Sequence, residues 1–263
     1  MNAITIKGAS VYLEDNLVLK EINWELKRGA RCFIMGANGA GKTTLVKLLM
    51  GYVWPLYGAE VDILGYRYGE SNLSEVRKKI GWVSPFMQHW TSPESRALNV
   101  VISGLDGSLG LFRKPLPEEV EHALAILEQL NAAHLAERHW YALSSGEQVK
   151  FLIARALITS PELLILDEPS VYMDLAGREY LLGEIERFAH SRPDLTLIFI
   201  TQRIEEIMPV FRDGMALKAG RIYCAGTTEA VLTEANLEAV FDIPVRLLRT
   251  DDGRFWPVVG RRP

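Results

Sequence analysis

The sequence has no apolar run long enough to cross a membrane. Stretches such as Leu195–Ile200 have the length of a single buried strand, whereas a membrane-spanning helix needs about 20 consecutive apolar residues. The first residues, Met1–Lys7, also lack the charged and then apolar arrangement of a signal peptide. These absences argue against a membrane-spanning chain and predict a soluble, cytoplasmic one.

Cysteine and net charge are also scarce. Two cysteines, Cys32 and Cys224, are too few for a disulfide framework, and we expect small buried hydrophobic side chains at both positions. The net charge of -4 lacks the basic excess of most nucleic-acid-binding proteins, so no nucleic acid partner is predicted. With 48% hydrophobic and 24% charged residues and no internal repeat, the 263 residues are typical of one large globular domain or two modest ones.

What the sequence does contain is a series of strand and helix patterns. Arg31–Met35 is a short apolar run, and the leucines of Thr43–Met50 have helical spacing. Residues 86–158 are mostly helical in pattern, and Pro117 marks the entry to an amphipathic run. Other strands are expected at Ile4–Lys7, Ile22–Leu26, Ile80–Ser84, Leu163–Leu166 and Leu195–Ile200. The pattern predicts a parallel α/β core interrupted by a helical insertion.

The tail of the chain is expected to form an extension. Residues 228–263 contain a helix-like stretch, Glu229–Phe241, followed by short strand-like pieces, and we expect this segment to pack on the core. Arg261 and Arg262 are expected in a solvated end.

A glycine-rich segment, Gly36–Thr43, fits the phosphate-binding P-loop pattern G-x-x-x-x-G-K-[ST]. Such a loop turns successive backbone N–H groups toward phosphates, and the following helix presents its positive end to them. Lys42 would add a point charge to the β- and γ-phosphates, and the Thr43 hydroxyl would ligate Mg²⁺. The residues assigned to nucleotide binding in and after this loop are Gly36, Asn38, Gly39, Ala40, Gly41, Lys42, Thr43 and Thr44.

Two carboxylates follow a second apolar strand pattern. Leu163–Leu166 leads into Asp167 and Glu168, and ligands gather at the carboxyl ends of strands in open α/β sheets. This arrangement resembles the second (Walker B) motif of P-loop ATPases. It implies that Asp167 orients Mg²⁺ and that Glu168 polarises the attacking water as a general base.

The segment Leu143–Glu147 reads Leu-Ser-Ser-Gly-Glu and resembles the signature motif of the ATP-binding-cassette (ABC) ATPases. Together with the motifs above, it gives a resemblance that covers nearly the whole chain, with the motifs in the family's order. The resemblance implies a P-loop NTPase core, mainly a parallel sheet with antiparallel N-terminal strands, and an inserted helical subdomain at about 86–158. The ABC ATPase domain would span residues 1–227.

The same resemblance implies a homodimer that binds two ATP molecules with Mg²⁺. In the family, the signature of one subunit lies across the ATP of the other, a role that here falls to Ser144, Ser145, Gly146 and Glu147. Asp174 corresponds to the aspartate that crosses the dimer interface. Tyr12 lies where the family places an aromatic that stacks on adenine, although an ordinary strand aromatic is the alternative interpretation.

This sequence departs from the family pattern at several positions. Ser145 replaces a glycine and Glu147 replaces a glutamine, and both changes are mild. The glutamine expected soon after Ile80–Ser84 is displaced, which makes Gln88 the candidate metal ligand. Gln202 stands where the family has a histidine that contacts the γ-phosphate. Because an amide cannot carry charge or shuttle a proton, we expect slow but nonzero ATP turnover.

Three functions are compatible with these motifs. The first is the energy-coupling subunit of a membrane importer, which would attach peripherally to a permease at the inner face of the plasma membrane. The others are a soluble ABC ATPase outside transport and a nucleotide-dependent dimerisation switch. Within the family, Ile153–Leu157 resembles a group associated with molybdate transport and photorepair, and Val231–Phe241 resembles ATPases of siderophore and vitamin B12 importers.

Overall fold

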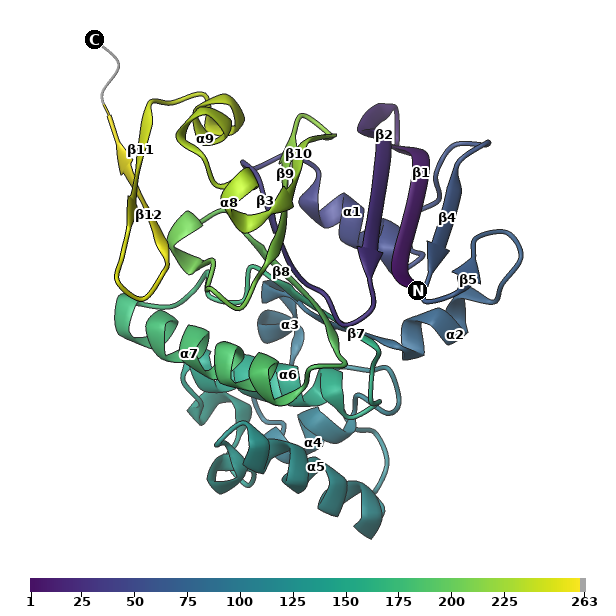
Figure 1. The fold of residues 1–263 in the computed structure, drawn as a ribbon. Coiled ribbons are helices and arrows are strands. Elements are labelled where there is room, and N and C mark those ends of the chain that lie inside the picture. Colours follow the sequence, from purple (N-terminus) through teal and green to yellow (C-terminus); the bar gives the residue numbers. More distant parts are fainter. Residues whose placement is uncertain (261–263) are drawn as a thin grey trace. The chain divides into compact units, whose positions relative to one another are not determined.

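The computed structural model describes residues 1–260 and divides into two compact units (Figure 1). The first unit combines Met1–Arg77 with the chain from Thr196 onward, and the second is Lys78–Leu195. Arg261 and Arg262, which we expected in a solvated end, lie outside the described residues.

An antiparallel sheet opens the first unit. Its strands β1 (Asn2–Leu13) and β2 (Asn16–Lys27) are twelve residues each, far longer than the alternation in the sequence predicts. The hairpin is irregular, because its register shifts between Ile6 and Ala9, where Gly8 has a φ of +66°. Strands β4 (Glu60–Ile63) and β5 (Tyr66–Arg67) complete the order β2-β1-β4-β5.

A second sheet of this unit carries the glycine-rich loop. Strand β3 (Arg31–Met35) has the predicted bounds and lies between two parallel neighbours, β8 (Thr196–Thr201) and β9 (Asp213–Lys218). Strand β10 (Arg221–Thr227) is antiparallel to β9. In the β3–β8 register Met35 is opposite Thr201. The segments that follow these two residues, the glycine-rich loop and Gln202, therefore begin at the same edge of the sheet.

Apolar side chains fill the interior of each unit. Every residue of β8 is buried, and so is every residue of β3 after Arg31. In the first unit the rings of Phe199 and Phe211 stack with their centroids 5.2 Å apart, and in the second Phe151 is fully buried. Such continuous apolar strands are typical of parallel sheets that are covered on both faces.

The second unit joins a pair of parallel strands to the predicted helical insertion. Strand β6 (Ile80–Val83) pairs with β7 (Leu163–Asp167), whose five residues are all buried. The helices are α3 (Pro85–Trp90), α4 (Ala97–Ile102), α5 (Pro117–Gln129), α6 (Ser145–Leu157) and α7 (Leu175–Ser191). Short 3₁₀ turns lie at Ala133–Leu135 and Trp140–Ala142. Helices and 3₁₀ turns are thus the regular elements between residues 86 and 158, within a unit that spans Lys78–Leu195.

The remaining helices belong to the first unit, and one sequence expectation about them is wrong. Helix α1 (Lys42–Leu49) follows the glycine-rich loop, and Ile204–Glu206 is a 3₁₀ turn. Helix α2 (Leu73–Lys78) lies in this unit except for its last residue, Lys78. The stretch expected as one helix from Glu229 to Phe241 is broken into α8 (Thr228–Val231) and α9 (Glu234–Phe241).

A local capping arrangement explains the break. The Thr233 Oγ1 accepts a hydrogen bond from the Asn236 backbone N–H at 3.2 Å, which starts a new helix. The Asn236 side chain donates to the carbonyls of Ala230 and Val231 and so satisfies the end of the preceding one. Beyond it, β11 (Val245–Arg249) and β12 (Phe255–Val259) form an antiparallel hairpin.

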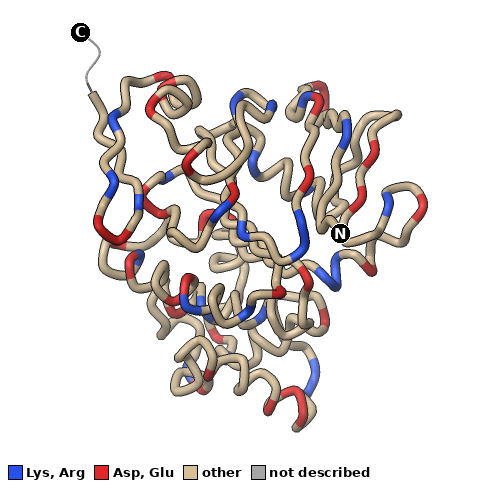
Figure 2. Tube along the Cα trace, viewed as in Figure 1, with Lys and Arg blue, Asp and Glu red and all other residues tan. Residues whose placement is uncertain are grey.

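Charges of both signs are interspersed along the trace of both units (Figure 2). Across residues 1–260, no helix combines the length and the apolar character that crossing a bilayer requires.

Candidate functional site

The glycine-rich loop is shaped by close backbone contacts. A Cβ on Gly36 would lie 2.5 Å from the Leu217 carbonyl oxygen, and one on Gly41 would lie 2.9 Å from a methyl group of Leu19. Both glycines also have a positive φ, +156° and +104° respectively. Side chains at either position would force the loop open, so the two glycines are required by the fold around the loop as well as by any ligand.

The loop encloses the ammonium group of Lys42. Its Nζ donates to the Gly36 carbonyl at 2.8 Å and to the Ala37 carbonyl at 3.2 Å, and the residue is 6% exposed. The next side chain, Thr43, is exposed, and the one after it, Thr44, is buried. Helix α1 has no acidic residue in its first turn, so the positive end of its dipole is not neutralised there. The loop can therefore bind an anion with backbone N–H groups, an ammonium and an exposed hydroxyl.

Gln202 leaves the same sheet edge through a tightly bonded turn. Thr201 Oγ1 donates to the Glu206 carboxylate at 2.6 Å and accepts from the Arg203 N–H at 3.0 Å. Arg203 in turn lies 3.4 Å from Glu206. These bonds fix the backbone on both sides of Gln202, which follows the sheet edge from which the glycine-rich loop also begins.

Tyr12 is the penultimate residue of strand β1 and is 48% exposed. Its strand partner across the hairpin, Leu17, is exposed too. An aromatic ring this open can stack on a planar ligand.

In the second unit, the two predicted carboxylates follow β7 directly. Asp167 is 4% exposed, and Glu168 is partly exposed with a φ of +48°. A left-handed conformation is uncommon for a residue other than glycine and is found at strained functional positions. The turn places a buried and a more open carboxylate one after the other at the carboxyl end of a buried strand.

The signature segment begins helix α6 with a capping box. Ser144 Oγ accepts from the Glu147 N–H at 3.3 Å, while the Glu147 carboxylate accepts from the Ser144 N–H at 2.7 Å and lies 2.9 Å from its hydroxyl. Ser144 is exposed, and Gly146 is partly exposed. The Ser-x-x-Glu spacing is itself a capping-box pattern, and this structural role for Glu147 was missed in the sequence.

Gln88 contacts the same segment. Its Nε2 donates to the Ser145 carbonyl at 3.1 Å, and its own backbone carbonyl accepts from Trp140 Nε1 at 3.2 Å. The neighbouring residue on α3, His89, lies edge to face with Tyr172, with ring centroids 5.0 Å apart. Helix α3 is thus tied both to the signature segment and to the residues that precede Asp174.

Asp174 caps the start of α7. Its Oδ1 accepts from the Gly177 N–H at 2.8 Å, and the side chain is exposed. A buried ion pair, missed in the sequence, connects this helix to α6. Lys150 Nζ lies 3.4 Å from the Glu184 carboxylate, and both side chains are 5% exposed. Because the pair is buried, it holds the helices that begin at the signature segment and at Asp174 in a fixed relation.

The predicted residues thus form two sets. The first unit holds the glycine-rich loop, Gln202 and Tyr12, and the second holds the carboxylates, Gln88, the signature segment and Asp174. No group of three or more His, Cys, Asp or Glu side chains in the described residues is arranged to hold a metal ion. A hydroxyl such as that of Thr43 and a carboxylate such as that of Asp167 are oxygen donors of the kind that Mg²⁺ prefers alongside substrate phosphates.

Comparison with known proteins gives the family that the chain matches. Residues 19–171 match the protein family described as ABC transporter. The chain is 39% identical over 253 residues to the uncharacterized ABC transporter ATP-binding protein YlmA of Bacillus subtilis (strain 168), with 96% of each chain covered. It is 29% identical to the molybdate import ATP-binding protein MolC of Haemophilus influenzae, over 92% of this chain and 89% of that one.

A solved structure also matches over the whole length. An inward-facing ABC transporter assigned to the metal-chelate type contains a chain with a TM-score of 0.80 and 27% identity, and 98% of each chain is covered.

Proposed function

This chain belongs to the ABC transporter family, and we propose on that premise that it is the ATP-binding and ATP-hydrolysing subunit that drives a membrane importer. The observation that carries the proposal is the glycine-rich loop, which encloses Lys42 and leaves Thr43 exposed. Importer ATP-binding proteins among the relatives, matched over most of their length, support the role in uptake.

The loop is proposed to bind the phosphates of ATP. The backbone N–H groups of Gly39, Ala40 and Gly41 are suited to the β-phosphate, and Lys42 would exchange its two loop carbonyls for phosphate oxygens. Asn38 and Thr44 flank these contacts, and Tyr12 would stack on the base. Mg²⁺ would be held by Thr43, by Asp167 through water, and by Gln88, and when bound it neutralises charge on the β- and γ-phosphates.

Glu168 is proposed as the general base. Its carboxylate accepts a proton from the water that attacks the γ-phosphorus, and the bond to the β–γ bridging oxygen breaks as ADP leaves. Gln202 would donate an amide hydrogen bond to the γ-phosphate. It cannot supply the positive charge or the proton exchange of a histidine, which supports slow turnover.

Replacing Gln202 by histidine is therefore expected to raise steady-state ATP turnover by about tenfold, because an imidazole can carry charge and exchange a proton near neutral pH. Phosphate release by purified protein measures the change. Gln202→Ala serves as the control and should lower the rate below that of the unmodified chain. An unchanged rate in Gln202→His would contradict the assignment.

The signature segment is proposed to act on the ATP of a second copy. The Ser144 hydroxyl and the Gly146 N–H lie at the start of α6, and they would reach the γ-phosphate bound by the partner. To do so, Ser144 must exchange its contact with Glu147 for one with phosphate. Asp174 would cross the same interface. Two identical subunits related by a two-fold axis satisfy both sites, so the proposed assembly is a homodimer.

We propose a catalytic domain over residues 1–227, with a helical part at about 86–158. An extension follows from residue 228. The extension, with α8, α9 and the β11–β12 hairpin, belongs to the first unit.

A permease is proposed to dock on helix α3, at the cytoplasmic face of the membrane where ATP is available. Rings of Trp82, Phe86 and Trp90 contact edge to face in series, with centroids 5.2 and 5.1 Å apart, and the last ring is 73% exposed. An open aromatic at the end of a packed series suits a helix-in-groove contact.

Copurification tests this partner. The Glu168→Gln chain, tagged and incubated with ATP, is expected to recover a polytopic membrane protein from detergent-solubilised membranes of its native cells. Adding Trp90→Ala should reduce the recovery, whereas adding Phe112→Ala should not, although Phe112 is 92% exposed in the same unit. Recovery of soluble partners only would contradict the transport role and favour a non-transport ATPase.

A further inference from the structure

A pocket lies in the first unit, at the end of β3 opposite the glycine-rich loop. It encloses about 440 Å³ between the end of β2, the β2–β3 turn and the start of β9, a volume that suits a small ligand. The loop follows Met35, whereas the pocket is reached at Cys32. At about 3.3 Å per strand residue, roughly 10 Å of strand separates the two, so a ligand here would not compete with ATP.

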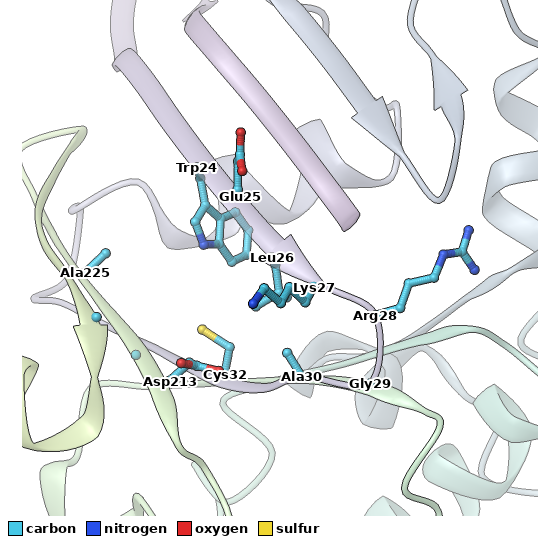
Figure 3. Close-up of a pocket in the computed structure, with 12 residues that line it drawn as sticks. Trp24, Glu25, Leu26, Lys27, Arg28, Gly29, Ala30, Cys32, Asp213 and Ala225 are labelled. Atoms are coloured by element: carbon cyan, nitrogen blue, oxygen red, sulfur yellow. The ribbon is translucent and has the colours of Figure 1, made fainter. Parts of the chain in front are cut away.

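The pocket has apolar walls. Trp24 is 7% exposed and Leu26 is 5% exposed, and they lie on the inward face of β2. Ala30 and Ala225 form other parts of the wall. Figure 3 shows the indole of Trp24 bordering the space, while the Glu25 carboxylate points away from it. Such walls favour an apolar portion of a ligand over water.

Two charges of opposite sign face the same space. The Lys27 ammonium and the Asp213 carboxylate are directed into the pocket in Figure 3. Within residues 1–260, the two do not form an ion pair with each other or with any other side chain. An anion alone would satisfy only Lys27, and a cation alone would satisfy only Asp213. Both residues are exposed, so water solvates each charge when the pocket is empty, and a molecule that carries both charges can form an ion pair with each of them.

We propose that this pocket binds a small zwitterion of the amino-acid class, with its carboxylate on Lys27, its ammonium on Asp213 and an apolar side chain against Trp24 and Leu26. The lining offers no glycine-rich loop and one cationic group directed inward, which disfavours a second nucleotide. This binding site is independent of the ATP site and of the permease.

A buried thiol in the pocket reports on its occupancy. Cys32 is 2% exposed, and its sulfur is directed into the space. Burial, assisted by the negative charge of Asp213, raises the pKa of the Cys32 thiol, so it stays protonated at neutral pH and reacts slowly. The sequence has one other cysteine, Cys224, so Cys32 is the sole thiol of a Cys224→Ser chain.

The test measures the rate at which an uncharged disulfide reagent modifies Cys32 in the Cys224→Ser chain. At saturating concentration, at least one of L-leucine, L-methionine and L-phenylalanine is expected to slow the reaction by about tenfold or more. Two analogues of the protecting amino acid serve as controls, one without the carboxylate and one without the ammonium. Each should slow the reaction by less than about twofold, because each can form only one of the two ion pairs.

Variants that remove one of the two pocket charges test which ligand group each charge binds. In the Asp213→Asn variant, the analogue without an ammonium should protect Cys32 as well as the amino acid does. In the Lys27→Met variant, which changes an exposed position, the analogue without a carboxylate should protect Cys32 as well as the amino acid does. Each rate is compared with that of the same variant without ligand. Absence of protection by all three amino acids, or protection by the single-charge analogues as strong as that of the amino acid in the Cys224→Ser chain, would overturn the proposal. None of these measurements depends on ATP hydrolysis.

Discussion

Replacing Glu168 by glutamine is expected to reduce ATP hydrolysis about a thousandfold while leaving ATP binding intact. General-base catalysis contributes about 10²- to 10⁴-fold to such reactions, and glutamine keeps the size of the side chain without its ability to accept a proton. The left-handed backbone at this position, with φ of +48°, is equally accessible to both residues. Phosphate release measures hydrolysis, and titration calorimetry measures ATP affinity.

Glu162→Gln is the matched control for this change. Glu162 precedes the same strand in the same unit, and its partly exposed carboxylate pairs with Lys79 at 2.7 Å. Exposed pairs of this kind contribute little, so turnover should stay within about twofold of the unmodified chain. A Glu168→Gln protein that retains more than about a tenth of the original rate would show that another group takes the proton.

Much of the fold and site was predictable, because steric demands and burial leave strong local patterns. The bounds of β3 match the apolar run Arg31–Met35. Few other residue types fit the glycine-rich loop, since a Cβ on Gly36 would lie 2.5 Å from a backbone carbonyl oxygen. Predictions of this kind use residues that are close in the sequence. They succeed when the packing of the fold requires the same residue types as the local pattern.

Other features depend on pairs far apart in the chain. The hydrogen bond from Gln88 to Ser145 joins residues 57 positions apart, and the sequence around either residue does not indicate the other. The ion pair of Lys150 with Glu184 joins two helices in the same way. Cys32 meets Asp213 only through the register of β3 with β9. The break between α8 and α9 depends on neighbouring residues, but it was missed in the sequence. The helical spacing of the apolar residues continues through Thr233 and hid its role as an N-cap.

A carboxylate in place of Gly146 is expected to reduce hydrolysis at least a hundredfold, because it would put a negative charge where the partner's γ-phosphate must lie. Gly146 is partly exposed, and a Cβ there would come no closer than 4.0 Å to its nearest neighbour, the Met173 sulfur. The Gly146→Asp chain should therefore fold. Thermal unfolding compared with that of the unmodified chain verifies this point.

In the proposed homodimer each ATP lies between the P-loop of one copy and the signature segment of another, and mixing two inactive variants tests this arrangement. Lys42→Ala removes the ammonium that would bind the phosphates, and Gly146→Asp blocks the signature segment. In a mixed dimer, one site combines both defects and the other combines neither. With random pairing, about half of the dimers are mixed, so the mixture should recover up to about a quarter of the original ATPase rate. A mixture no more active than its two components measured separately would show that the two copies do not share their sites.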